Sequence, residues 1–136
     1  MPKSRVPRQL TPLEIAAAGQ FAHALDLSAI VAVTDSAGRI TYCNRRFCEV
    51  SGYSAAELIG STHRIINSGV QPPGFFADMW SRITRGEVWR GTICNRRKDG
   101  ALYWVDTTIV PDRRRDGSIA GYTAIRNEVT EHIKAL

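Results

Sequence analysis

The sequence of 136 residues predicts an α+β fold in which short helices cover one face of an antiparallel sheet. Two short β-type segments come first, within residues 28–44, and several short helical segments follow as far as Gly86. Three longer strands, at 88–97, 101–111 and 118–127, then form two consecutive hairpins. Strands and helices segregated along a chain in this way favour an α+β arrangement over an alternating parallel sheet. A hydrophobic fraction of 43% at this length is enough for one domain with one core.

An N-terminal helix is predicted over residues 11–27. Thr11 can cap it, Pro12 suits its first turn, and Glu14 completes a capping box. Apolar side chains recur at helical spacing and make this helix amphipathic; they are Leu13, Ala17, Phe21, Ala24 and Leu25. Such a face packs either on the domain itself or on a second copy of the chain, and the sequence leaves both open.

The middle of the chain reads as two strands followed by short helices. The strands come from "AIVAVTDSAGRITYCN", with "DSAG" as the turn between them. Asn44 and Ser54 are candidate N-caps of the next two helices, and Glu57 completes a second capping box. Residues 61–74 contain the Gly and Pro of an irregular loop. The helix after this loop ends at Gly86 and places four large apolar residues on one side: Phe76, Met79, Trp80 and Ile83.

One amide stands at the end of an apolar row in the strand at 88–97. Side chains alternate along a strand, so one face of it carries Trp89, Gly91, Ile93 and Asn95. If that face is the core, the Asn95 amide needs hydrogen-bond partners there. The residues alone allow two readings: an amide bonded to backbone or water, or an amide that contacts a molecule held between sheet and helices. The neighbouring strands supply two further inward rows, which are Tyr103, Val105, Thr107 and Ile109, and Tyr122, Ala124 and Arg126.

Composition and motifs disfavour several classes of protein. Three cysteines without a CxxC pair argue against a disulfide framework or a zinc site. The net charge of +5 comes from short arginine clusters beside turns, so nucleic-acid binding is not expected. The sequence has no apolar run of membrane-span length and no secretory signal, which predicts a cytoplasmic protein without a membrane segment. It also has no nucleophile–base pair or phosphate-binding glycine loop, so an enzyme is not expected.

Residues 28–132 resemble a PAS domain. The family motifs occur in family order as "VTDSAGRI", "NRRF", "GY", "ELIG", "RRKDG" and "NEVTE", the last with Glu128 in place of the usual Asp. The resemblance implies a five-stranded antiparallel sheet in the order 2-1-5-4-3. PAS domains sense ligands, redox state or light, dimerise, and signal to a kinase, cyclase or chemoreceptor module. We therefore expect a leader and capping helix at 1–27, a sensor domain at 28–130, and the start of a connector helix to an effector at 131–136.

The segment "NSGVQPPGFFADMWSRITRGEVWRGTICNRRKDGALYWV" is most similar to the FAD-binding PAS domains of the bacterial aerotaxis transducer and the nitrogen-fixation flavoprotein regulator. This narrower resemblance implies a noncovalently held FAD, in preference to FMN. Haem ranks below both, because only His23, His63 and His132 could ligate its iron. Light-sensing LOV domains have an adduct-forming cysteine at the position of His63, so a sulfur–flavin adduct is not expected here.

The resemblance also gives roles to individual residues. An Asn95 amide can donate and accept, which matches the pyrimidine edge of a flavin ring. Arg126 falls beside the redox-active part of the ring, where a reduced, anionic flavin would be its partner; the alternative is an exposed arginine at a strand end. Asn44 is either a helix cap or a ligand contact, and Trp80 either a ring contact or core. The full candidate cofactor-binding set is Asn95, Trp80, Trp89, His63, Asn67, Ser68, Asn44, Phe76, Tyr103, Thr107 and Arg126.

The leading hypothesis from sequence is a redox- or oxygen-responsive sensor domain that holds FAD. The alternative is a PAS module without cofactor that forms a homodimer, through the N-terminal helix and the outer sheet face, or binds a partner.

Overall fold

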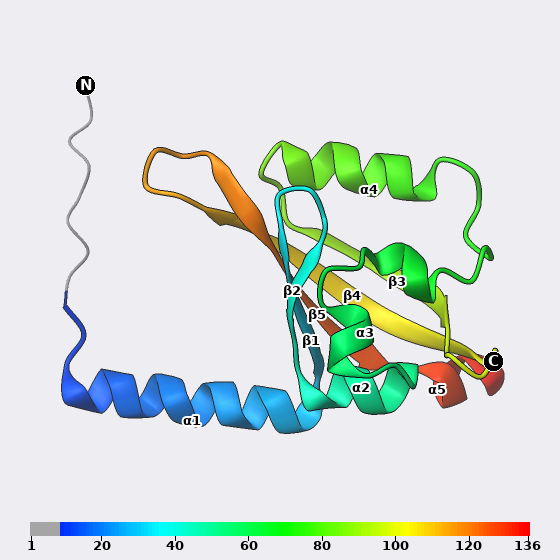
Figure 1. The fold of residues 1–136 in the computed structure, drawn as a ribbon, viewed down its shortest axis with the longest axis horizontal. Coiled ribbons are helices and arrows are strands. Elements are labelled where there is room, and N and C mark those ends of the chain that lie inside the picture. The colour runs from blue at the N-terminus through cyan, green and yellow to red at the C-terminus, as the bar shows by residue number, and fades with distance from the viewer. Residues whose placement is uncertain (1–8) are drawn as a thin grey trace.

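The computed structural model describes residues 9–136, so the first eight residues of the predicted leader lie outside it. It confirms the predicted α+β fold: five antiparallel strands form one sheet in the order β2-β1-β5-β4-β3 (Figure 1). The strands are β1 (Ile30–Asp35), β2 (Ile40–Cys43), β3 (Trp89–Arg96), β4 (Leu102–Arg113) and β5 (Ile119–Glu128). β4 runs two residues further than predicted, because Arg113 still pairs with Ile119 beyond an irregularity in the register.

Six helical segments accompany the sheet. They are α1 (Pro12–Ser28), α2 (Arg45–Ser51), α3 (Ala55–Leu58), the 3-10 helix η1 (His63–Ile66), α4 (Phe75–Thr84) and α5 (Thr130–Lys134), all within the described part of the chain. Thr11, Asn44 and Ser54 cap their helices as predicted, each accepting a hydrogen bond from the backbone N–H three residues later. The stretch predicted as an irregular loop contains η1, whose first turn is capped by Thr62.

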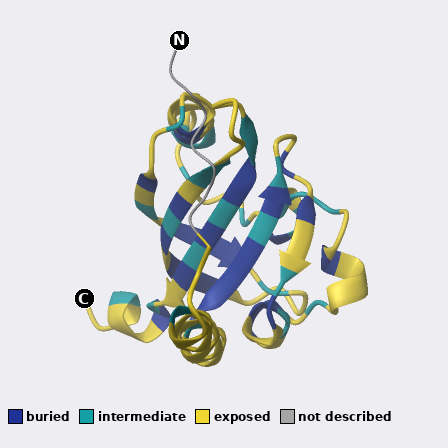
Figure 2. Ribbon diagram, turned by 90° about the vertical axis from the view of Figure 1, so that its left-hand side faces the viewer, coloured by how far each residue is buried: buried dark blue, intermediate teal, exposed yellow. Residues whose placement is uncertain are grey.

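α2, α3, η1 and α4 cover one face of the sheet, whereas α1 projects away from it (Figure 1). The core lies between the sheet and the four covering segments, and buried strand residues form its floor (Figure 2). No residue of α1 is buried: Leu13 is 80% and Phe21 71% exposed. The prediction of an amphipathic helix is wrong, because apolar side chains lie around the whole of α1 rather than on one face. Large apolar residues of this helix are exposed in a single chain. No helix in the described range is both long and apolar enough to cross a bilayer.

The loop after η1 closes the free edge of β3. Asn67 forms an isolated β-bridge with Asn95. The Ser68 hydroxyl donates to the carbonyl of Cys94 at 2.6 Å, and the Cys94 N–H donates to Oε1 of Gln71 at 2.7 Å. The backbone N–H and C=O of Cys94, on the free edge of β3, are thus occupied by the side chains of Gln71 and Ser68 and are closed to another strand.

The C-terminal end is hydrogen-bonded to the sheet through residues 128–130, including the Val129 N–H, which donates to the Trp104 carbonyl at 2.8 Å. The Trp104 N–H on β4 donates to the Thr130 hydroxyl at 2.9 Å, and that hydroxyl donates to Glu128 at 2.7 Å. Glu128 also pairs with Arg97 at 2.7 Å. This cluster, made by the "NEVTE" motif, connects α5 to β4 and to the turn after β3.

Candidate ligand cavity

A cavity of about 670 Å³ lies between the sheet and the segments η1 and α4. This volume falls within the usual range for small-molecule and cofactor sites. Its floor comes from β1, β3, β4 and β5, and its walls from α4, η1 and the turn between β1 and β2. Six of the candidate residues line it: Asn95, Trp80, His63, Asn67, Phe76 and Arg126.

Asn95 is buried at the end of β3, on the inward row that strand alternation predicts. Its cross-strand neighbour is Tyr103 on β4, and its amide is hydrogen-bonded to the Tyr103 hydroxyl. Burial raises the pKa of Tyr103 to about 12, so the phenol is neutral. One hydroxyl cannot satisfy two N–H donors and a carbonyl oxygen, so the amide keeps bonding capacity toward the cavity.

Arg126 on β5 is only 4% exposed, which excludes the strand-end, solvent-exposed reading for this structure. Its Nε and Nη1 atoms are buried without a hydrogen-bond partner. Its guanidinium carbon lies 6.0 Å from the centre of the Phe47 ring. Burial lowers the pKa of Arg126 to about 10, so the side chain remains charged near neutral pH. A buried cation without an acidic partner is costly unless an anion joins it.

His63 is the first residue of η1 and faces the same cavity. Its ring stacks on Phe47 with centroids 6.1 Å apart and an interplanar angle of 16°. Its Nε2 atom is buried without a hydrogen-bond partner. Burial, and next the positive charge of Arg126, hold the pKa of His63 well below its ordinary value of 6.5. The imidazole is therefore neutral in this structure.

The electrostatic character of the cavity follows from these two residues. Nε and Nη1 of Arg126 and Nε2 of His63 are the buried side-chain atoms without partners in residues 9–136, and all belong to residues that line this cavity. Arg64 on η1 is a third basic residue of the lining, and no carboxylate lines it. The cavity thus suits a molecule that carries negative charge or several hydrogen-bond acceptors.

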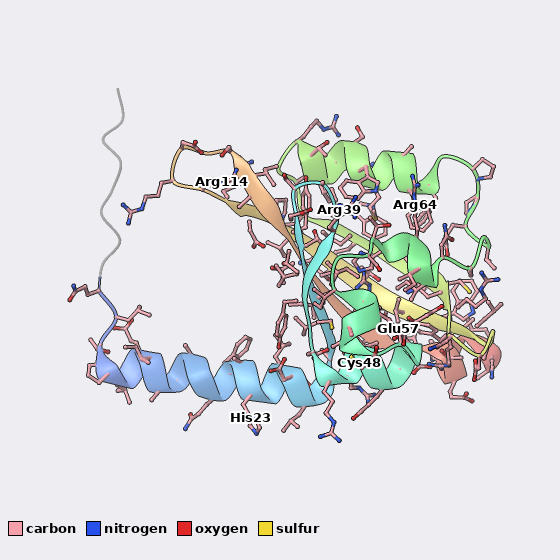
Figure 3. All side chains as sticks on the ribbon, in the orientation of Figure 1. His23, Arg39, Cys48, Glu57, Arg64 and Arg114 are labelled. Carbon is pink, nitrogen blue, oxygen red and sulfur yellow. The ribbon has the colours of Figure 1, made fainter. Side chains whose placement is uncertain are left out.

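The opening of the cavity is aromatic and basic. Trp80 on α4 is 37% exposed and meets Tyr122 on β5 edge-on, with ring centroids 5.7 Å apart. Gly38 lies against the Trp80 indole: a Cβ there would be 2.9 Å from the ring. Arg64 is exposed and is labelled in Figure 3 between η1 and α4. A flat group and a phosphate would both find contacts here.

Five candidate residues do not line the cavity. Asn44 accepts from the backbone N–H groups of Val31 and Phe47 and donates to the Ala29 carbonyl at 2.8 Å, so its amide serves as a helix cap. The Ser68 hydroxyl donates to the Cys94 carbonyl at the edge of β3 and is used there. The remaining three are buried but do not line the cavity; they are Trp89, Tyr103 and Thr107.

Most of the lining lies outside the candidate set, and Arg64 and Gly38 are the two omissions that bear on the chemistry. Arg64 follows His63 directly in the stretch predicted as a loop, and only the η1 turn brings both residues to the cavity. Gly38 was assigned to a turn, which is correct, but its contact with Trp80 joins segments far apart in the chain. A positive φ of 85° at this residue is a local signal for glycine and carries no information about that contact.

No group of His, Cys, Asp and Glu in the described range could hold a metal ion. The cysteines are free: Cys43 and Cys48 are half-buried, Cys94 is buried, and none lines the cavity.

Comparison with known proteins decides the family, because the family described as the PAS fold matches residues 40–126, more than half of the chain. The chain belongs to the PAS family. A relative of the PAS domain described here is the aerotaxis receptor of Escherichia coli strain K12, 41% identical over 106 residues. The nitrogen fixation regulatory protein of Klebsiella pneumoniae is 33% identical over 103 residues. These matches cover 78% and 76% of this chain but 21% of each relative, so the chain spans about a fifth of their length.

Solved structures agree with this assignment. An RNA-binding light-oxygen-voltage receptor matches with a TM-score of 0.78 and 26% identity, over 98% of this chain and 38% of the receptor chain. A PAS domain from Colwellia psychrerythraea matches with a TM-score of 0.68 and 26% identity, over 85% of this chain and 98% of that domain. The chain is a PAS sensor domain related to the domains of longer signalling proteins.

Proposed function

We propose that this PAS domain binds FAD noncovalently and responds to redox state or oxygen. The observation that carries the proposal is the buried, unpartnered guanidinium of Arg126, which shares a cavity with the Asn95 amide. The flavin of the aerotaxis and nitrogen-fixation PAS domains, which the sequence resembles, has the matching chemistry. Its ring system accepts and returns electrons reversibly and becomes more negative when reduced.

The residues of the cavity fit a flavin. Ile66, Ile93 and Ile109 provide apolar contacts for a flat ring. The free capacity of the Asn95 amide fits a polar edge that both donates and accepts. Arg126 offers two unused donors to the same ring system. A reversible redox response of the flavin needs no sulfur–flavin adduct, and the described lining contains no cysteine.

The opening favours FAD over FMN within this proposal. A dinucleotide has a longer phosphate-bearing tail and an adenine that must leave the ring pocket. The exposed Arg64 guanidinium is suited to phosphate, and the Trp80 indole to stacking on adenine. FMN would use the inner cavity alone and leave the indole without a ligand contact.

The test is an absorption spectrum of the purified protein, followed by titration of the ligand-free protein with FAD, FMN and riboflavin. We expect a yellow protein whose flavin bands bleach on reduction and recover in air, with FAD as the tightest ligand. Arg64→Gln should weaken FAD and leave riboflavin affinity unchanged, and the matched exposed variant Arg90→Gln should change neither. A colourless protein that binds none of the three flavins would overturn the proposal.

We propose that the output passes through flanking helices to an effector elsewhere in a longer protein, and that this domain itself catalyses no reaction. The relatives are longer than this domain, which supports an attached effector. α5 is connected to β4 by the Thr130 contacts, and β4 pairs along its length with β5, which carries Arg126. A movement of the Arg126 guanidinium can therefore be transmitted through β5 and β4 to the C-terminal helix α5.

The second candidate function is homodimerisation through α1, with or without cofactor. The uncovered apolar side chains of α1, with Phe21 at 71% exposure, are the observation that favours it. We expect Phe21→Glu to convert a dimer to a monomer in sedimentation experiments, whereas Gln20→Glu, with the same added charge on the same helix, should leave the dimer intact. A monomeric wild-type protein at high concentration would exclude this function.

A further inference from the structure

Two basic side chains of the cavity lining each lie about 6 Å from one aromatic ring. Phe47 on α2 stacks with His63, centroid to centroid at 6.1 Å, and its ring centre is 6.0 Å from the guanidinium carbon of Arg126. Phe47 is itself only 1% exposed, so this arrangement is held by the core. Both basic groups present unpartnered nitrogen atoms.

Few charged or titratable groups surround His63 and can change the proton affinity of its Nε2 atom. From β5, Arg126 faces it and Tyr122 also lines the cavity; from η1 itself, Arg64 lies at the opening. From β4, Tyr103 is neutral because burial raises its pKa to about 12. The residues that α4 and β3 contribute to the lining are uncharged. The proton affinity of Nε2 is therefore set by Arg126 and by whatever molecule occupies the cavity.

We propose that His63 takes up a proton at Nε2 when the flavin in this cavity is reduced, and that Arg126 holds the negative charge that reduction creates. This inference rests on the proposed function. A bound flavin reduced by two electrons from an external reductant, such as a reduced electron carrier, would take up one proton and gain one negative charge. A second proton passes from water to His63. Oxidation by dioxygen or another acceptor removes both electrons and returns both protons to water.

The physical reason is charge compensation. In the empty or oxidised site, burial and the Arg126 charge keep the imidazole neutral. A negative charge within about 4–6 Å raises the pKa of a basic group by about one to three units, which is a 10- to 1000-fold gain in proton affinity. The same charge also offsets the repulsion from Arg126. Stacking on Phe47 fixes the imidazole plane, so the proton can be gained with little movement of the ring.

Nuclear magnetic resonance of the imidazole groups tests this directly, because the chain has three histidines. His23→Gln and His132→Gln assign the two exposed ones. We expect the His63 signals of the neutral form at about pH 7 in the ligand-free protein and with oxidised FAD, and those of the imidazolium after reduction with dithionite. Bound FAD with His63 neutral in both redox states overturns this inference and leaves the proposed function intact. Failure to bind flavin at all overturns both.

A redox titration across several pH values gives an independent readout. Each proton that accompanies a two-electron couple changes the midpoint potential by about 30 mV per pH unit. The wild-type slope should be about 60 mV per pH unit, and His63→Gln, which keeps a polar group but cannot gain a proton, should halve it. The control His23→Gln should keep the wild-type slope. Equal slopes in wild type and His63→Gln would overturn the inference: at about 60 mV per pH unit the ring takes both protons, and at about 30 mV only one proton is taken up and His63 takes none.

Discussion

Replacing Arg126 by methionine should make the ligand-free protein more stable and a poorer flavin binder. The guanidinium is buried, two of its nitrogen atoms have no partner, and no ion pair within residues 9–136 includes it. Methionine keeps the unbranched apolar stem and removes the charge. A side chain retained for a ligand is expected to cost stability when that ligand is absent.

The magnitude follows from the perturbed ionisation of the side chain. Burial lowers the pKa of Arg126 from 12.5 to about 10. One pKa unit corresponds to about 1.4 kcal/mol, so folding with the charge buried costs about 3 kcal/mol near neutral pH. The gain from removing the charge is partly offset, because methionine packs less well in this position and the cavity loses hydration. We therefore expect a gain of about 1–3 kcal/mol, or about 4 °C in Tm for each kcal/mol.

Urea unfolding of ligand-free Arg126→Met and wild type, followed by circular dichroism, measures the difference. Arg90→Met on β3 is the matched control, since Arg90 is exposed and should change stability by less than about 0.5 kcal/mol. Arg126→Met should bind FAD about 10- to 100-fold more weakly, because a charge-assisted contact is lost, whereas Arg90→Met should bind FAD as wild type does. An Arg126→Met protein less stable than wild type would show that the guanidinium is well solvated, and the reasoning from burial would be refuted.

Two further perturbations test the architecture around the cavity. Asn44→Ala should cost about 2–4 kcal/mol in urea unfolding, because it leaves the Val31 N–H and the Ala29 carbonyl without partners and removes the side-chain cap of the Phe47 N–H. The exposed cap variant Ser54→Ala should cost about 1 kcal/mol or less, and equal losses would contradict this reasoning. Gly38→Ala should displace the Trp80 indole and weaken FAD binding in a fluorescence titration. The control Gly60→Ala has a similar φ but open space around its Cβ, so it should lower stability without affecting FAD binding. Equal effects of the two variants on FAD binding would contradict this reasoning.

The parts of the fold that sequence predicted are those governed by local rules. The alternation along the strands placed Asn95 and Arg126 on the inward face, and both are buried. Capping chemistry located three helix starts, including Asn44. The strand order came from the family resemblance rather than from the residues, because pairing between β1 and β5 joins segments about ninety residues apart.

The parts that sequence could not predict depend on tertiary contacts. The η1 turn lies in a stretch whose Gly and Pro content indicated only a loop, so the position of His63 against Phe47 was not accessible. Alternation also predicted too large a site: Thr107 and Tyr103 are buried, but neither lines the cavity. Apolar residues at helical spacing suggested an amphipathic α1, but other apolar residues lie around the rest of this helix, and the spacing did not show that they are exposed in one chain.

The loop at residues 67–71 contributes both to the cavity wall and to the protection of the free edge of β3. Asn67 belongs to the cavity wall, while Ser68 and Gln71 occupy the carbonyl and N–H of Cys94 at the sheet margin. A bound molecule that orders the wall therefore also shields the Cys94 amide from hydrogen exchange with water. An empty site would loosen the same loop and leave β3 free to recruit a foreign strand, so cofactor loss and aggregation should rise together.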